Sequence, residues 1–161
     1  MPSDGEGPQV GAAVYRKVLL CYDGSREGRR ALKQGADVVL CMKTQAYLLA
    51  IGQNALAAAI PEGVTPELAQ REEERADALL QEGVRWLTDH GVPAEGSLEY
   101  GSAVDCIAAT AERIGADLIV LGHKPRGSLA RWWSSSDEES LLERVSCSIL
   151  VAVSEDDGDD R

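Results

Sequence analysis

The sequence predicts a single α/β domain: a doubly wound, five-stranded parallel sheet with helices on both of its faces. Short apolar segments of strand length alternate strictly with segments whose apolar residues recur at helical spacing, five of the first kind and four of the second. Such alternation implies right-handed β-α-β crossovers and therefore a parallel sheet. The run ADLIVLG at 116–122 is apolar throughout, as in a strand covered on both faces. A chain of 161 residues can bury a substantial core as one domain.

The first half of the chain is expected to supply two strands and two helices. The apolar run at 14–22 ends at the turn DGS, and the segment after it has helical spacing. Thr65, with Pro66 behind it, is a favourable start for the second helix, and Gly91 lies just past its end. Residues 53–64 are ambiguous between a loop and one helical turn. The expected elements are a strand at about 14–22, a helix at 26–42, a strand at 44–52 and a helix from 65 to about 90.

The second half is expected to continue the alternation and to end in a strand. Ser102 and Asp105 have the spacing of a capping box, which opens the third helix, and Gly115 stops it. Ser136 and Glu139 repeat the capping-box spacing before the fourth helix. The expected elements are a strand at 94–100, a helix at 102–115, a strand at 116–122, a helix at 136–145 and a strand at 146–153.

The charge of the chain limits its partners. With 27 acidic and 16 basic residues, the formal net charge is -11, which argues against nucleic acid as a partner. We interpret residues 1–13 as a disordered N-terminal tail and SEDDGDDR at 154–161 as an acidic C-terminal tail, on either side of a domain at 14–153. No window approaches the roughly 18 apolar residues of a membrane span, and the N-terminal segment lacks the features of a secretory signal. We therefore expect a cytoplasmic protein without a membrane or nucleic-acid partner.

Residues with metal-binding or catalytic potential are scattered. No C-x-x-C pair occurs, so neither a metal site nor a disulfide is expected. Three of the four cysteines lie in or beside apolar runs, where the residue usually acts as a small buried hydrophobe: Cys21, Cys106 and Cys147, with Cys41 as the fourth. His90 and His123 are isolated from any nucleophile and carboxylate at a recognisable spacing. The sequence therefore indicates no catalytic centre.

A ligand site is expected where two loops face each other at one edge of the sheet. Ligands of open parallel sheets bind outside the carboxyl ends of the strands, where the strand order reverses. The common orders 2-1-3-4-5 and 3-2-1-4-5 both place the first strand beside a later one. If the first and fourth strands are neighbours, the loops DGSREG at 23–28 and GHKPRGSLARWWSSS at 122–136 share one crevice.

Asp23 is the candidate ligand in the first of these loops. It ends a strand, and Gly24 and Ser25 follow it, so its carboxylate can accept hydrogen bonds from an amine or from a ribose hydroxyl. The alternative interpretation is that Asp23 only caps the first helix or forms an Asx-turn. The sequence leaves both interpretations open.

The second loop is basic although the chain is acidic, which suggests that it binds an anion. Its glycines let backbone N–H groups approach an anion, its Lys and Arg residues add positive charge, and its serines precede a helix N-terminus that attracts anions. The candidate residues are Gly122, Lys124, Arg126, Gly127, Ser134, Ser135 and Ser136. The alternative interpretation is a solvated loop in which Ser136 merely caps the helix.

Three segments of the chain resemble the universal stress protein family. They are KVLLCYDGSREGRRAL at 17–32, YGSAVDCIAATAERIGADLIVLG at 100–122 and ERVSCSILVAV at 143–153, and the resemblance extends over about 14–153. It implies an adenine nucleotide alpha hydrolase-like fold, with strand order 3-2-1-4-5, and a stress-response function. It also implies a homodimer that forms through the last strand, Ile149–Val153.

The resemblance further implies a ligand, which would be ATP, ADP or AMP with or without Mg²⁺. Asp23 matches the family's aspartate that contacts adenosine, and Ile51 matches an aliphatic residue that packs on the base. The residues that complete the expected site at the two strand ends are Gly24, Ser25, Leu121 and His123.

The phosphate signature departs from the family pattern of Gly, two residues, Gly, nine residues, then Gly with Ser or Thr. Gly122 and Ser136 fit the pattern, but Pro125 and Ser135 stand where the second and third glycines belong. Proline has no N–H to donate to a phosphate. Two functions therefore remain open: a nucleotide-binding stress protein, and a dimeric regulatory or interaction module of the same family that binds no nucleotide. An enzyme, at most a slow ATPase, is the weakest hypothesis because no base or nucleophile is positioned.

Overall fold

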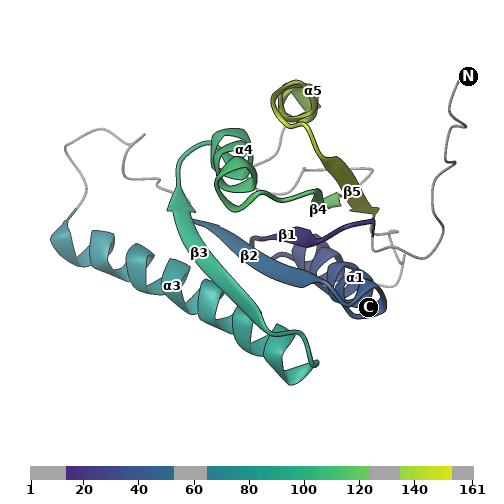
Figure 1. Cartoon of the computed structure of the whole chain (residues 1–161). Coiled ribbons are helices and arrows are strands. Elements are labelled where there is room, and N and C mark those ends of the chain that lie inside the picture. The colour runs from purple at the N-terminus through teal and green to yellow at the C-terminus, as the bar shows by residue number, and fades with distance from the viewer. Residues whose placement is uncertain (1–13, 53–64, 124–134, 154–161) are drawn as a thin grey trace, which may run out of the picture.

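A five-stranded, all-parallel sheet in the order β3-β2-β1-β4-β5 forms the centre of the protein (Figure 1). The structure is a computed structural model that describes residues 14–52, 65–123 and 135–153. The elements are β1 Lys17–Tyr22, α1 Arg26–Met42, β2 Gln45–Gly52, α3 Pro66–Asp89, β3 Ala94–Tyr100, α4 Ala103–Ile114, β4 Leu118–His123, α5 Ser135–Arg144 and β5 Ser148–Val153. The predicted fold class and strand order are confirmed.

The sheet is covered on both faces because its central strands are apolar on both sides. Along β1, Leu20 and Tyr22 pack with α1 and α3, whereas Leu19 and Cys21 pack with α4 and α5. These side chains are at most 3% exposed, which is the burial expected of a continuous apolar run in a parallel sheet. Two cores result, one on each face, and the loops at the carboxyl ends of the strands lie between them at one edge.

Several of the predicted helix ends are confirmed by their backbone geometry. The Thr65 hydroxyl accepts a hydrogen bond from the Leu68 N–H at 3.3 Å, and Pro66 occupies the first turn of α3. Gly115 is the left-handed cap of α4 at φ +67°, and Gly91 follows α3 at φ +79°. These helix-end residues act through their own backbone preferences, so the helix ends that they predict are found in the folded chain.

Neither predicted capping box is formed as expected. Ser102 precedes α4 in extended geometry, but its side chain makes no capping hydrogen bond. The reciprocal half of the box is also missing, because the Asp105 carboxylate is paired with Arg144 of α5 instead of the Ser102 N–H. Ser136 does not cap α5, because the helix already begins at Ser135. Three successive serines fit a cap equally well, so the pattern could not fix the starting residue.

The first strand begins three residues later than the apolar run suggested. The Asp117 carboxylate accepts the backbone N–H of Arg16 at 2.8 Å and that of Lys17 at 3.0 Å. These donors are therefore bound to a side chain from the turn before β4, and ladder pairing starts at Lys17. In the same way, β4 and β5 start two residues after their predicted first residues.

The cysteines only partly follow the expectation of burial. All four are free thiols; Cys21 is buried, Cys106 and Cys147 are half-buried, and Cys41 is exposed. Among the described residues, no three or more His, Cys, Asp or Glu side chains form a group that could hold a metal ion. Nor does any described helix have the length and apolar character needed to cross a membrane. The ambiguous segment 53–64 and the two predicted tails lie outside the described residues.

Candidate functional site

Asp23 forms a tight corner between β1 and α1. One of its oxygens, Oδ1, accepts the backbone N–H of Ser25 at 2.9 Å and also the Ser25 hydroxyl. The Ser25 hydroxyl in turn accepts the N–H of Gly28 at 2.9 Å, so Ser25 is the N-cap of α1. The structure thus forms the Asx-turn that the sequence left as an alternative for Asp23.

The second oxygen of Asp23 is different. Oδ2 is buried, and it has no hydrogen-bond partner in the part of the chain that the structure describes. Leaving a buried acceptor without a donor costs about 1–3 kcal/mol, and more when the group is charged. The same carboxylate therefore fixes the corner through one oxygen and leaves the other without a donor among the described residues.

Gly28 allows this corner to close, and the sequence analysis did not single it out. A Cβ at this position would collide with Asp23 Oδ1 and would lie 3.2 Å from the Ser25 hydroxyl and 3.4 Å from the Asp23 backbone nitrogen. Only a glycine leaves room for the carboxylate against the first turn of α1. In the sequence Gly28 is only the second glycine of DGSREG, and without the fold it cannot be told from an ordinary loop glycine.

Gly122, at the end of β4, packs against the same turn of α1. A Cβ on Gly122 would lie 2.6 Å from the carbonyl carbon of Glu27 and 3.1 Å from the nitrogen of Gly28. Because β1 and β4 are neighbours in the sheet, the ends of both strands meet at the start of α1. The structure therefore brings together three predicted site residues, Asp23, Ser25 and Gly122, around Gly28.

Gly24 completes the corner for a conformational reason. Its φ of +76° lies in the left-handed region that residues with side chains rarely adopt. A Cβ there would also meet a methyl group of Leu79 on α3 at 2.7 Å. The Leu79 methyl group can move aside, so the backbone conformation is the reason that the turn favours glycine.

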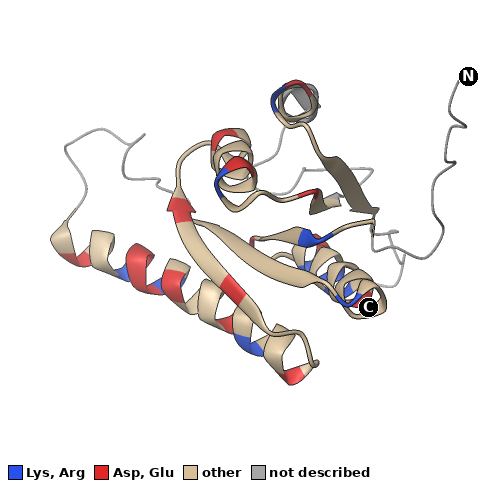
Figure 2. Cartoon of the chain, viewed as in Figure 1, with Lys and Arg blue, Asp and Glu red and all other residues tan. Residues whose placement is uncertain are grey.

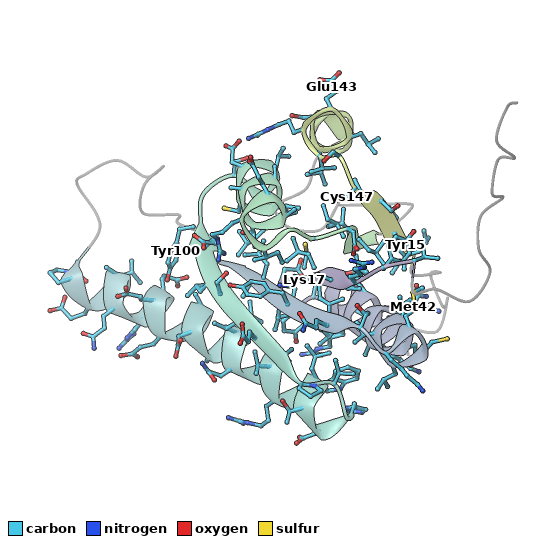
Figure 3. The ribbon with its side chains drawn as sticks, viewed as in Figure 1. Tyr15, Lys17, Met42, Tyr100, Glu143 and Cys147 are labelled. Carbon is cyan, nitrogen blue, oxygen red and sulfur yellow. The ribbon has the colours of Figure 1, made fainter. Side chains whose placement is uncertain are left out.

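Ile51 and Leu121 lie in the core on the α4 side of the sheet. They are only 3% and 5% exposed, and they pack with the first turns of α4. Little of either side chain is left uncovered, so their predicted contact with a base stays a prediction. The neighbouring end of β2 is crowded as well, because a Cβ on Gly52 would lie 2.5 Å from the ring of Tyr100 at the end of β3 (Figure 3).

Cys21, two residues before Asp23, is not an activated nucleophile. Burial in the sheet raises the pKa of its thiol far above the ordinary value, and the nearby Asp23 carboxylate raises it further. The thiol therefore stays protonated at neutral pH and contributes packing rather than chemistry.

Only some of the residues predicted to bind phosphate lie in the described part of the structure. Lys124, Arg126, Gly127 and Ser134, together with Pro125, lie outside the described residues. His123 is the last residue of β4, while Ser135 and Ser136 form the start of α5. Their roles in binding an anion remain predictions.

Comparison with known proteins decides the family. The model of the universal stress protein family matches residues 14–153.

The chain belongs to the universal stress protein family.

Relatives of this family resemble the chain over most of its length. The universal stress protein Sll1654 of Synechocystis is 26% identical over 142 residues, which covers 88% of this chain and 87% of the relative. A crystal structure of a universal stress protein in complex with cAMP superposes with a TM-score of 0.61 at 18% identity, covering 85% of this chain and 96% of that one. The universal stress protein from Archaeoglobus fulgidus in complex with dAMP gives a TM-score of 0.59 at 16% identity, covering 86% and 98%. At these identities the superpositions show the shared fold.

Proposed function

We propose that this universal stress protein binds an adenine nucleotide at the edge of the sheet between the Asp23 corner and the end of β4. The observation that carries the proposal is the buried Asp23 Oδ2, which lacks a donor among the described residues. An adenosine moiety offers hydroxyl and amine donors that would satisfy it. Two universal stress proteins of the same fold are described in complex with cAMP and dAMP, which supports this ligand class.

The residues present fit the adenosine part of the ligand better than its phosphates. Asp23 has a free acceptor in Oδ2, because Oδ1 alone holds the corner. The space beside Gly122 is filled by the carbonyl of Glu27, so this glycine is accounted for by packing. Pro125 and Ser135 replace two signature glycines. We therefore expect a nucleotide with few phosphates to bind as well as ATP does, with Mg²⁺ carried by the phosphates when they are present.

The substitution Asp23→Asn tests the proposal with little disturbance of the fold. The amide oxygen can keep the Ser25 hydrogen bonds, while the amide nitrogen places a donor where Oδ2 was an acceptor. We expect the Kd for AMP and for ATP, measured by titration calorimetry, to rise about 10-fold or more, which corresponds to at least about 1.4 kcal/mol. Asp37→Asn on the exposed side of α1 is the matched control and should leave the Kd unchanged.

Two results would count against nucleotide binding at the Asp23 corner. One is the absence of heat when the unchanged protein is titrated with millimolar AMP or ATP, together with no copurified nucleotide in mass spectrometry after mild denaturation. The other is an Asp23→Asn protein that binds as tightly as the unchanged protein. The first result would favour the interaction module that binds no nucleotide, and the second would show that Asp23 does not hold the nucleotide.

A second proposal concerns β5, through which we propose that the protein forms a homodimer. β5 is an edge strand that pairs only with β4 in the described sheet, and its Val151 and Val153 are 44% and 45% exposed. Leu142 of the preceding helix α5 is also exposed, at 64%. An open edge strand with apolar side chains is a ready surface for a second copy.

Val151→Lys tests the dimer. In multi-angle light scattering, the unchanged chain should give twice the mass of a single chain, and the variant should give the single-chain mass because a charge would be buried at the interface. Leu40→Lys, on the exposed side of α1, is a matched apolar-to-lysine control. A single-chain mass for the unchanged protein would overturn the proposal.

A further inference from the structure

A groove of about 450 Å³ lies between α1 and α3, on the face of the sheet opposite α4. Its floor is formed by Tyr22 at the end of β1 and by Leu32 of α1, both of which are buried. Trp86 of α3, which is half-buried, also lines it. We call this space the α1–α3 groove. Its volume lies within the roughly 300–1,000 Å³ of small-molecule sites, and an apolar floor is typical of such sites.

The Trp86 ring is held in a fixed position. It stacks on the His90 ring, with 3.9 Å between the ring centroids and an angle of 23° between the ring planes. His90 Nδ1 is also 2.7 Å from the Trp86 carbonyl oxygen, which ties both residues to the end of α3. A side chain that is ordered before binding loses little conformational freedom when a ligand covers it. The groove therefore has a preorganised aromatic surface.

The rim of the α1–α3 groove is positively charged in a strongly acidic protein. Arg29, Arg30 and Lys33 of α1 line the groove, and all three are exposed. Lys33 lies three and four residues after the two arginines, so the three side chains are neighbours on the helix surface. Figure 2 shows the contrast between the basic residues of α1 and the acidic surface of α3. Arg26 also lines the groove, but it already interacts with another group of the chain.

Two of these cations have no counter-charge in the part of the chain that the structure describes. Glu82 of α3 is the single acid among the described residues that line the groove. Its carboxylate accepts the Tyr22 hydroxyl at 2.8 Å and lies 3.8 Å from Arg29, so one carboxylate balances one guanidinium. Neither Arg30 nor Lys33 forms an ion pair with any described residue. An anion in the groove would therefore meet two unpaired cations above an apolar floor.

We propose that the α1–α3 groove binds a small aromatic anion, namely an aryl phosphate or an aryl carboxylate. The ring of the ligand covers Trp86 and the apolar floor, and its anionic group accepts charge-assisted hydrogen bonds from Arg30 and Lys33. The cations from Arg29 to Lys33 span only about 6 Å along the helix axis, which suits one anionic group better than the row of carboxylates of an acidic peptide.

This site is separate from the proposed nucleotide site. The residues that form the Asp23 corner, which are Asp23, Ser25 and Gly122, do not line the α1–α3 groove. The aromatic anion needs no ribose, because no acceptor of the Asp23 corner takes part in its binding. The proposal therefore does not depend on nucleotide binding.

The probes are 1-naphthyl phosphate and 1-naphthoate, whose binding to the full chain is followed in ¹H–¹⁵N spectra. We expect saturable shifts of the amides of residues 29–33 and of the Trp86 indole N–H, which is assigned by its absence in Trp86→Phe. At least one probe should bind with a Kd below about 5 mM. Inorganic phosphate lacks the ring and 1-naphthol lacks the charge, so each should bind at least about 5-fold more weakly. Binding of the probe should weaken between about 20 mM and about 0.5 M salt, because salt screens exposed charges.

Two double variants with equal changes of net charge identify the binding residues. Arg30→Gln with Lys33→Gln should raise the Kd of the probe at least about 5-fold, because two exposed ion pairs are lost. Lys43→Gln with Arg85→Gln removes two exposed charges that do not line the groove, and it should leave the Kd unchanged. Asp23→Asn should also leave the Kd of the probe unchanged, whatever its effect on AMP.

Several results would overturn the proposal. Neither probe shifts the resonances of residues 29–33 and Trp86, or inorganic phosphate or 1-naphthol binds as tightly as the probes. Equal losses of affinity in the two double variants would show that only the overall charge matters. Loss of probe binding in Asp23→Asn would place the probe at the Asp23 corner. Tetraglutamate that binds at the same residues more tightly than both probes would assign the groove to an acidic protein segment.

Discussion

Gly122→Ala should destabilise the fold, because backbone atoms of α1 occupy the space in which the new methyl group would lie. The new Cβ would lie 2.6 Å from the Glu27 carbonyl carbon, still closer to the carbonyl oxygen, and 3.1 Å from the Gly28 nitrogen. These atoms belong to the first turn of α1 and cannot rotate away as a side chain could. Overpacking costs typically about 1–3 kcal/mol, and a clash with backbone belongs at the upper end of that range.

The assay is thermal and urea unfolding followed by circular dichroism. For a chain of this size, about 3 kcal/mol corresponds to a fall in Tm of about 6–12 °C. Gly115→Ala is the control: it adopts φ +67° and has no atom within 4 Å of its Cβ position, so it should cost only the roughly 1–2 kcal/mol of a left-handed conformation. If Gly122→Ala is no less stable than Gly115→Ala, then the contact between β4 and α1 does not require glycine and the reasoning is wrong.

Two further predictions follow from the hydrogen bonds around α1. Ser25→Ala should lower the free energy of unfolding by about 1 kcal/mol, because it removes the N-cap of α1. Ser102→Ala should lower it by less than about 0.5 kcal/mol, because Ser102 makes no capping bond. Equal losses in urea unfolding would contradict the assignment of Ser25 as the cap. Burial, and then the hydrogen bond to Glu82, raise the pKa of Tyr22 above its ordinary 10.0 in the folded protein. The unfolded chain therefore loses this proton first, so stability should decline as the pH rises above about 10, and Tyr22→Phe should flatten that decline; an unchanged slope of unfolding free energy against pH would refute the assignment.

The fold could be predicted because its signals are local and redundant. Strand runs such as ADLIVLG are buried on both faces, and glycines such as Gly115 end helices through their own backbone preference. The two capping boxes failed for different reasons: the Asp105 carboxylate has a distant partner, whereas Ser136 is already inside a helix that begins at Ser135. Asp105 has the right spacing from Ser102, but a pairing with Arg144 from another helix engages its carboxylate. A pattern of four residues contains no information about such a tertiary partner.

The site was only half predictable for a related reason. Asp23 was a candidate from its place at a strand end, and the sequence left open whether it would cap the helix or bind a ligand. One oxygen of Asp23 forms the Asx-turn and the other has no described donor, so the role in the turn does not exclude a role in binding a ligand. Gly28 was missed because its importance arises only when the carboxylate of Asp23 is folded against it.

Asp23 and Gly122 match the family site most clearly, but they do not support the proposed nucleotide binding equally. Gly122 is required by its contact with α1, so a glycine there is expected whether or not a phosphate is bound. Asp23 could satisfy its turn with a single oxygen, and an asparagine could do the same without a buried, unpaired carboxylate oxygen. A carboxylate at this position costs free energy that only a donor to Oδ2 can offset. The case for a nucleotide therefore rests on Asp23, and Asp23→Asn is the substitution that decides it: if the variant gains stability while losing affinity for AMP, then Oδ2 serves a ligand at the expense of the fold.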